Sequence, residues 1–120
     1  MNTTIKTTNY EITPDIEKLV HEKLSHVERL VPSDVESLAE VELELVEERK
    51  NGHAVYRAEV NLTVDGTLHR ASSTRRSLQN ALSDVKQELQ KVLRRVKGRN
   101  ESMVKRGGRL AKKMLRGFNS

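Results

Sequence analysis

The longest regular pattern in the chain is an apolar stripe between Ser77 and Lys97. Hydrophobic residues recur there at steps of three and four, the spacing of one face of an α-helix. They are Leu78, Ala81, Leu82, Val85, Leu89, Val92, Leu93 and Val96. Ser77 offers a hydroxyl for the N-cap, and Gly98 is expected to end the helix. The opposite side carries a positively charged patch of Lys91, Arg94 and Arg95. The pattern predicts a helix with one face on a core and the other toward an anion.

A second helix is predicted after Thr13, which serves as N-cap, with Pro14 at the first helical position and Pro32 as the stop. Its apolar stripe consists of Ile16, Leu19, Val20, Leu24, Val27, Leu30 and Val31. Lys23 falls within this stripe, about 20° from Ile16 on a helical wheel. Two interpretations stay open. Either the lysine stem packs while its ammonium reaches water, or the lysine has a functional role at a helix–helix seam.

Alternating and β-branched segments predict four strands. The first covers residues 3–8, and the second covers residues 39–50 and ends at Asn51-Gly52, which predicts a two-residue hairpin turn. A second such turn is predicted at Asp65-Gly66, leading into residues 67–74. Counting outward from the two turns gives the expected pairs: Val41 with Leu62, Leu43 with Val60, Leu45 with Ala58, Val60 with Ala71, and Leu62 with His69. A bulge that turns Leu68 inward is the alternative for the last strand.

The order strand, helix, three strands, helix predicts an α+β fold of type βαβββα. A right-handed crossover makes strand one parallel to strand two, so the four-stranded sheet is mixed. Because each strand has one apolar face, both helices are expected to pack on one face of the sheet. The other face is net acidic, with Glu40, Glu42, Glu44 and Glu59 around Arg57 and Arg70. We therefore expect an anionic partner on the helices.

Charge is distributed unevenly along the 120 residues, whose net charge is +5. Residues 1–90 hold 11 Lys and Arg against 16 Asp and Glu, whereas residues 91–120 hold 11 against one, Glu101. Such a basic end is typical of a nucleic-acid binder, and a solvated charged tail is the alternative. The chain has no cysteine, no apolar leader and no run of membrane-spanning length. We expect a soluble, cytoplasmic protein of one domain, without membrane contact.

The sequence gives no support for an enzyme, a metal site or a cofactor. His21 and His26 are five residues apart, about 140° around a helix, so they do not form a zinc-protease pair. The strand carboxylates alternate outward into water, so we expect a solvated face and not a catalytic carboxylate pair. Tyr56 is the one aromatic residue in the strands, and it is expected to face inward, which argues against a sheet that stacks bases. The remaining possibility is that the helices recognise the shape and the phosphates of a nucleic acid.

Three segments carry a resemblance to a known family: EITPDIEKLVHEKLSHVERL, YRAEVNLTVDGTLHRA and the helix that begins at Ser77. From about Ile5 to Lys97 the chain resembles the ribosome hibernation promoting factor / ribosome-associated inhibitor A family. The resemblance implies a layout similar to a double-stranded-RNA-binding domain. It also implies a place in the decoding channel of the small ribosomal subunit, across the tRNA and mRNA sites.

By position, the resemblance implies that the family's RNA-binding residues correspond to Lys23 on the first helix and to Lys91 and Arg95 on the last. His26 and Arg29 stand at neighbouring positions that are basic in the family, and Arg94 lies beside Arg95. The chain departs from the family at Ser77, Gln79 and Glu88, where acidic, aromatic and basic residues respectively are common. These departures shift the expected contacts to the second half of the last helix. The resemblance favours the functional interpretation of Lys23.

The resulting expectation is a ribosome-binding domain at residues 1–98 and a basic, flexible tail at 99–120, similar to a short form without a second domain. Further RNA contacts are expected at Lys97, Arg99, Lys105, Arg106, Arg109, Lys112, Lys113 and Arg116. The protein is expected to be a monomer in solution that takes no small-molecule substrate. It is interpreted as a stress-response hibernation factor that binds rRNA and inhibits translation. An rRNA-binding maturation factor, a structural ribosomal component and a general double-stranded-RNA binder are the alternatives.

Overall fold

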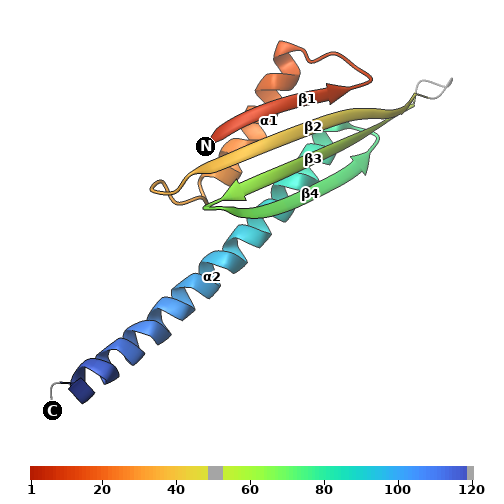
Figure 1. Cartoon of the computed structure of the whole chain (residues 1–120). Coiled ribbons are helices and arrows are strands. Elements are labelled where there is room, and N and C mark those ends of the chain that lie inside the picture. Colours follow the sequence, from red (N-terminus) through yellow and green to blue (C-terminus); the bar gives the residue numbers. More distant parts are fainter. Residues whose placement is uncertain (49–52, 119–120) are drawn as a thin grey trace.

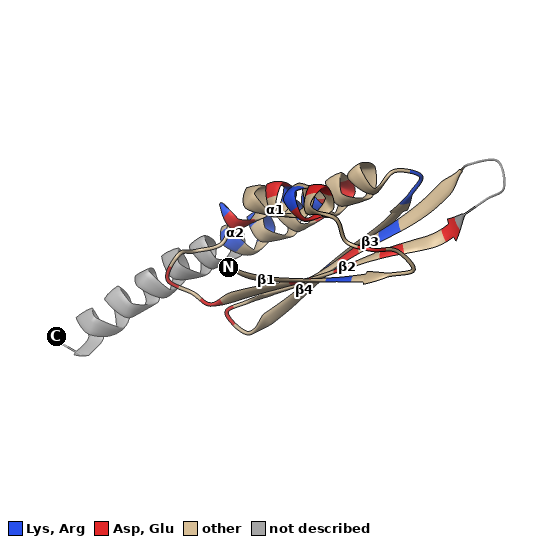
Figure 2. Ribbon diagram, turned by 90° about the horizontal axis from the view of Figure 1, so that it is seen from above, with Lys and Arg blue, Asp and Glu red and all other residues tan. Residues whose placement is uncertain are grey.

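The computed structural model describes residues 1–48 and 53–118, with side chains described at residues 1–47 and 53–98. Six elements follow one another: β1 (Asn2–Thr8), α1 (Pro14–Glu28), β2 (Ser37–Glu48), β3 (Ala54–Val64), β4 (Thr67–Arg75) and α2 (Leu78–Phe118). The sheet order is β1-β2-β3-β4, with β1 parallel to β2 and the other pairs antiparallel. Both helices cover one face of the sheet (Figures 1 and 2), so the predicted βαβββα fold is confirmed.

Both helices begin as their N-cap residues predict. Thr13 has an extended backbone, and its Oγ1 accepts a hydrogen bond from the Ile16 N–H at 3.2 Å. The Ser77 Oγ accepts the Asn80 N–H at 3.3 Å, and the Ser77 carbonyl accepts the Ala81 N–H at 3.0 Å. Each cap satisfies amide groups that have no partner within the first helical turn. The start of each helix is therefore fixed by local sequence.

The core between the sheet and the helices is aliphatic. Its members come from α1, from the inward faces of β2, β3 and β4, and from α2: Val20, Leu24, Val27, Ala39, Val41, Leu43, Ala58, Val60, Leu62, Ala71, Ala81, Leu82, Val85, Leu89 and Leu93. Among the described side chains no polar or charged residue is fully buried. Burial of these apolar side chains is the main favourable contribution that fixes both helices on the sheet.

The predicted pairing of β2 with β3 is wrong by two residues. Val41 pairs with Val60, Leu43 with Ala58, and Leu45 with Tyr56. A bulge between Leu45 and Glu47 accounts for one residue of this difference. A shift by two keeps every inward side chain on the inward face, so the hydrophobic pattern cannot distinguish the two registers. The predicted Asn51-Gly52 turn lies outside the described residues.

The hairpin between β3 and β4 has the predicted register. Val60 pairs with Ala71, Leu62 with His69, and Val64 with Thr67, which leaves Asp65 and Gly66 as the two turn residues. Their φ angles of 50° and 80° are the positive values that a type I′ turn requires. The alternative bulge is absent from this described pair of strands, and Leu68 is exposed.

The helix that begins after Ser77 does not end at Gly98, so this prediction is wrong. α2 continues through Gly98 to Phe118, so the molecule is elongated, with extents of 79 × 22 × 18 Å (Figure 1). Gly98 does not have the positive φ that ends many helices. A glycine inside a helix lowers helix stability by about 1 kcal/mol, and it does not by itself stop the helix. The division into a domain at 1–98 and a flexible tail at 99–120 stays a prediction.

Candidate nucleic-acid interface

The arginines on the outer face of the sheet form ion pairs with glutamates on the same face. The Arg57 Nε donates to Glu44 Oε2 at 3.0 Å, and the other guanidinium nitrogens donate to Glu59 and Glu42. The hydrogen bonds to Glu59 and then Glu44 raise the Arg57 pKa above its ordinary value. The Arg70 Nε donates to Asn61 Oδ1 at 2.8 Å and lies 3.6 Å from Glu59 Oε1. These cations are therefore already paired within the fold.

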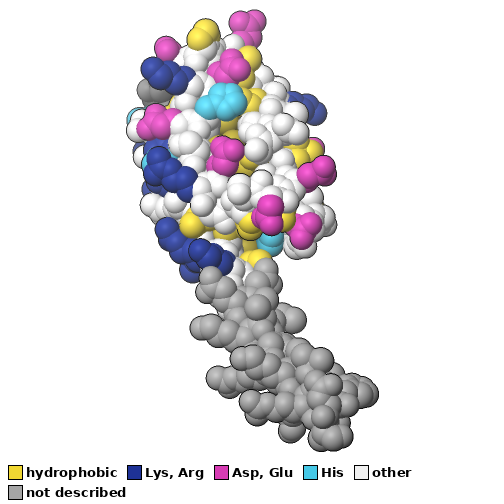
Figure 3. Space-filling model, turned by 90° about the vertical axis from the view of Figure 1, so that its left-hand side faces the viewer, with side chains coloured by type: hydrophobic (Ala, Val, Ile, Leu, Met, Phe, Trp, Pro, Cys, Tyr) yellow, Lys and Arg dark blue, Asp and Glu magenta, His cyan; other side chains and the backbone are white. Residues whose placement is uncertain are grey.

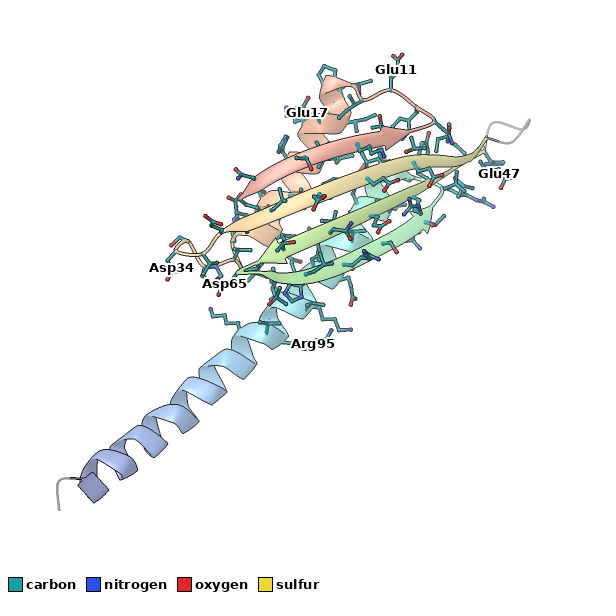
Figure 4. The ribbon with its side chains drawn as sticks, viewed as in Figure 1. Glu11, Glu17, Asp34, Glu47, Asp65 and Arg95 are labelled. Carbon is teal, nitrogen blue, oxygen red and sulfur yellow. The ribbon has the colours of Figure 1, made fainter. Side chains whose placement is uncertain are left out.

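Lys91, Arg94 and Arg95 on α2, which we call the α2 patch, lie in a different environment. All three are exposed, and none forms an ion pair with a described residue. Arg95 extends from α2 into solvent beyond the sheet (Figure 4). Lys and Arg side chains gather along one edge of the view in Figure 3, down to the last described side chains of α2. The patch presents positive charge that the fold leaves available to an external anion.

The end of α1 lies beside the α2 patch. The Gln90 side-chain amide donates to the His26 carbonyl oxygen at 3.5 Å, which places His26 next to the residue that precedes Lys91. Lys23 and His26 are half-buried, and Arg29 is exposed just after the helix. Of the predicted RNA-binding residues, the structure thus brings His26 close to the start of the patch.

Lys23 is half-buried and has no ion-pair partner among the described residues. Both interpretations of Lys23 stay open. Lys97 is exposed near the end of the described side chains. The side chains of the remaining predicted contacts lie outside the described part: Arg99, Lys105, Arg106, Arg109, Lys112, Lys113 and Arg116.

The first half of α1 has a different character from the patch. Asp15 and Glu17 occupy its first turn, and His21 Nε2 lies 4.0 Å from Glu17 Oε1.

In the described residues no group of His, Cys, Asp and Glu is arranged to hold a metal ion. No helix searched, again among the described residues, is long and apolar enough to cross a membrane.

Asp84 positions α2 on the sheet, a role that the sequence patterns did not reveal. Its Oδ2 accepts a hydrogen bond from the Ser73 hydroxyl at 2.7 Å and lies 3.3 Å from the Arg75 Nε. Both partners come from β4, so this carboxylate ties the first half of α2 to the edge of the sheet. The sequence does contain one signal for this role, because Asp84 is the lone acidic residue in the first two turns of the helix.

Comparisons with known proteins agree with this fold. The family model described as "Sigma 54 modulation protein / S30EA ribosomal protein" matches residues 3–101. The crystal structure of the Thermus thermophilus Protein Y N-terminal domain is similar at 28% identity and a TM-score of 0.67, covering 80% of this chain and 99% of that one. A ribosomal subunit interface protein from Coxiella burnetii shares the fold at 14% identity and a TM-score of 0.63, covering 82% and 99%. None of the curated proteins matches the chain.

Proposed function

The chain belongs to the Sigma 54 modulation protein / S30EA ribosomal protein family, and we propose that it binds the small ribosomal subunit through ribosomal RNA and thereby inhibits translation. The proposed site is the decoding channel, where the bound domain blocks the tRNA and mRNA sites. The proposed contact surface is the helix face, with the α2 patch and the neighbouring end of α1. In this role the protein acts as a hibernation factor and not as an enzyme.

One observation carries this proposal: the arginines of the sheet are paired within the fold, whereas those of the α2 patch have no ion-pair partner in the part of the chain whose side chains are described. Arg57 and Arg70 contact carboxylates, but Arg94 and Arg95 have no described carboxylate partner. A phosphate that approaches the patch therefore does not have to displace an internal partner. Each cation that neutralises a phosphate releases a condensed counterion, which favours binding at low salt.

The chemistry of the patch favours shape and backbone recognition over base reading. Lys and Arg contacts to phosphate fix position and orientation without reading sequence. The aromatic residues of the described domain, Tyr10 and Tyr56, pack against each other with ring centroids 6.1 Å apart. They are half-buried and therefore unsuited to stacking on unpaired bases. A structured ribosomal RNA surface fits these properties better than a single strand.

Sedimentation tests the proposal. Purified small subunits, large subunits and a 20-base-pair RNA duplex are mixed in turn with the protein and separated on sucrose gradients. We expect co-sedimentation with small subunits that weakens steeply with salt and resists competition by the free duplex. Effective competition by the duplex would instead identify a general double-stranded-RNA binder. Translation in a purified system should fall as the protein is added, and unchanged translation would contradict an inhibitory role.

Occupancy in cells separates inhibition from assembly. A hibernation factor should accumulate on ribosomes in starved cells and leave them during growth. A structural ribosomal component should be present at equal stoichiometry in both states, and a maturation factor should bind precursor subunits in growing cells. Either of these last two patterns would contradict the proposed function.

A further inference from the structure

A second lysine, Lys86 on α2, interrupts an apolar stripe in the same way as Lys23 on α1. Lys86 comes one heptad before the buried Leu93, and Lys23 comes one heptad after Ile16, so each lies about 20° from an apolar position of its own helix. Both lysines are half-buried. Neither has an acidic residue three or four positions away on its helix, and neither forms an ion pair with a described residue.

On α1, Lys23 lies on the side that meets α2. The hydrogen bond from the Gln90 side chain to the His26 carbonyl oxygen, 3.5 Å long, shows where the two helices meet. Around the α1 axis, Lys23 lies between His26, about 60° away, and the buried Val27, about 40° away. Its half-burial is therefore explained by the neighbouring helix together with the sheet.

Lys86 has the matching place on α2. It lies between Gln90, about 40° away, and Leu93. α1 connects two parallel strands, and α2 follows β4, which has the direction of β2, so both helices cross the sheet in the same direction (Figure 1). Lys23 precedes His26 by about 4.5 Å along α1, and Lys86 precedes Gln90 by about 6 Å along α2. The two lysines therefore stand at about the same level of the seam between the helices.

The described carboxylates near this level of the seam do not neutralise the two lysines. Glu22 and Glu88 are exposed, and they lie about 100° and 160° around their helices from the lysine of the same helix. Asp84 is held by Ser73 and Arg75 of β4. Partial burial reduces the screening of charge by water, so two cations at one level repel each other more strongly than on an open surface. An external anion between them would remove this repulsion.

We propose that Lys23 and Lys86, which we call the seam lysines, hold one phosphate group of the ribosomal RNA backbone between α1 and α2. The inference rests on the proposed function and extends its contact surface from the α2 patch across the seam to α1. Continuity with the patch identifies the occupant, because Gln90 directly precedes Lys91 in the chain. A backbone that passes over the patch thus reaches the seam within about one turn of α2. A phosphate held by both helices also fixes the orientation of the whole domain.

Lys86→Met tests the new contact, because it removes the charge and keeps most of the apolar stem. We expect the affinity for purified small subunits to fall about five-fold, and the salt dependence to become shallower. The thermal midpoint should stay equal or rise, since a repulsion is removed. Lys6→Met is the matched control, with the same change at an exposed residue of β1, and should bind within about two-fold of the unmodified chain. Equal affinities of the two variants, whether both unchanged or both reduced, would overturn the proposal.

A double-mutant cycle tests whether the seam lysines share one phosphate. If they do, the chain with both Lys23→Met and Lys86→Met should lose clearly less affinity than the product of the two single losses, because either change already weakens the same contact. Losses that multiply would mean two separate contacts and would overturn the shared site. Failure of the proposed function is distinguishable, since the unmodified chain itself would then not bind small subunits.

Inorganic pyrophosphate distinguishes RNA from a free phosphate compound as the occupant. Thermal unfolding of the free protein is followed with and without pyrophosphate, for the unmodified chain, Lys86→Met and Lys6→Met. The assignment to RNA requires that the affinity for small subunits depends on Lys86. A rise in the thermal midpoint with pyrophosphate that depends on Lys86, combined with an affinity for small subunits that does not, would identify a free phosphate compound and overturn the assignment to RNA.

Discussion

Among single residues, Tyr10 has the most unusual environment in the described part of the domain. Its hydroxyl oxygen is buried and has no hydrogen-bond partner there. Its ring meets the Tyr56 ring edge-on, with an interplanar angle of 75°. Burial, and to a smaller extent the neighbouring Tyr56, raise the Tyr10 pKa to about 12. An unpaired buried hydroxyl lowers stability, so this residue contributes through its ring and not through its polar group.

Tyr10→Phe should therefore leave the free energy of unfolding unchanged or raise it by about 1 kcal/mol. The pH dependence has a defined sign. Because the folded pKa exceeds the unfolded value of 10.0, the unfolded state loses the proton first, and stability falls as pH rises from 10 to about 12. Urea unfolding at pH 8 and pH 11 measures both effects. Equal losses of stability in the variant and the unmodified chain over this range would contradict the assignment.

Lys23 offers a test of the two open interpretations. Lys23→Met keeps most of the apolar stem and removes the charge, so the free energy of unfolding should change by less than about 0.5 kcal/mol. If the ammonium contacts RNA, affinity for small subunits should fall several-fold, and the salt dependence should become shallower. Urea unfolding and gradient sedimentation measure these quantities. Unchanged affinity would leave Lys23 with a packing role alone.

At the scale of elements, local signals predicted where each helix starts and which face of each strand is buried. Thr13 and Ser77 cap the helices as expected, and Asp65 with Gly66 forms the predicted turn. The β2–β3 register could not be predicted, because the bulge after Leu45 leaves the alternation of inward residues almost intact. Whether the last helix ends at Gly98 could not be predicted either, because glycine is tolerated within a helix that has other sources of stability.

Leu89 is fully buried where α2 crosses the sheet. Leu89→Ala should lower the free energy of unfolding by about 2–5 kcal/mol, the range for truncation of a buried leucine. Lys91→Ala, two residues along the same helix and exposed, is the matched control and should cost less than about 0.5 kcal/mol. If urea unfolding gives the two variants similar midpoints, the predicted apolar stripe is not the core side of α2.

Gly98 lies within a helix and Gly66 lies in a turn, so alanine substitutions at these two positions should have opposite effects on stability. Gly98 lies in α2 without positive φ, and a Cβ there would meet no atom within 4 Å, so Gly98→Ala should raise helix stability by about 0.5–1 kcal/mol. Gly66 has a φ of +80°, so Gly66→Ala should lower the free energy of unfolding by about 1 kcal/mol or more. Thermal unfolding followed by far-UV circular dichroism compares them. Destabilisation of both variants would mean that α2 does not continue through Gly98.

Across the whole molecule, the two faces differ in how their charges are used. The outer sheet face holds a carboxylate cluster around Arg57. The helix face ends in cations that have no described partner, next to the last turn of α1. The sequence predicted this division, because strand alternation places the glutamates outward and helical phase places Lys91, Arg94 and Arg95 together. It could not reveal that the sheet arginines are neutralised internally, which depends on the cross-strand pairs.

The central claim is that the α2 side of the molecule, and not the outer sheet face, contacts the ribosome. The direct test compares two double variants. One carries Arg94→Glu together with Arg95→Glu, and the other carries Lys6→Glu together with Arg70→Glu. Both variants change the net charge equally, and all four residues are exposed. Because exposed charges contribute little to stability, thermal midpoints should stay close to that of the unmodified chain.

Binding to small subunits and inhibition of translation in a purified system are then measured side by side. We predict that the α2 variant loses inhibition, whereas the sheet variant inhibits like the unmodified chain. Equal inhibition by the two variants, or loss confined to the sheet variant, would contradict the account.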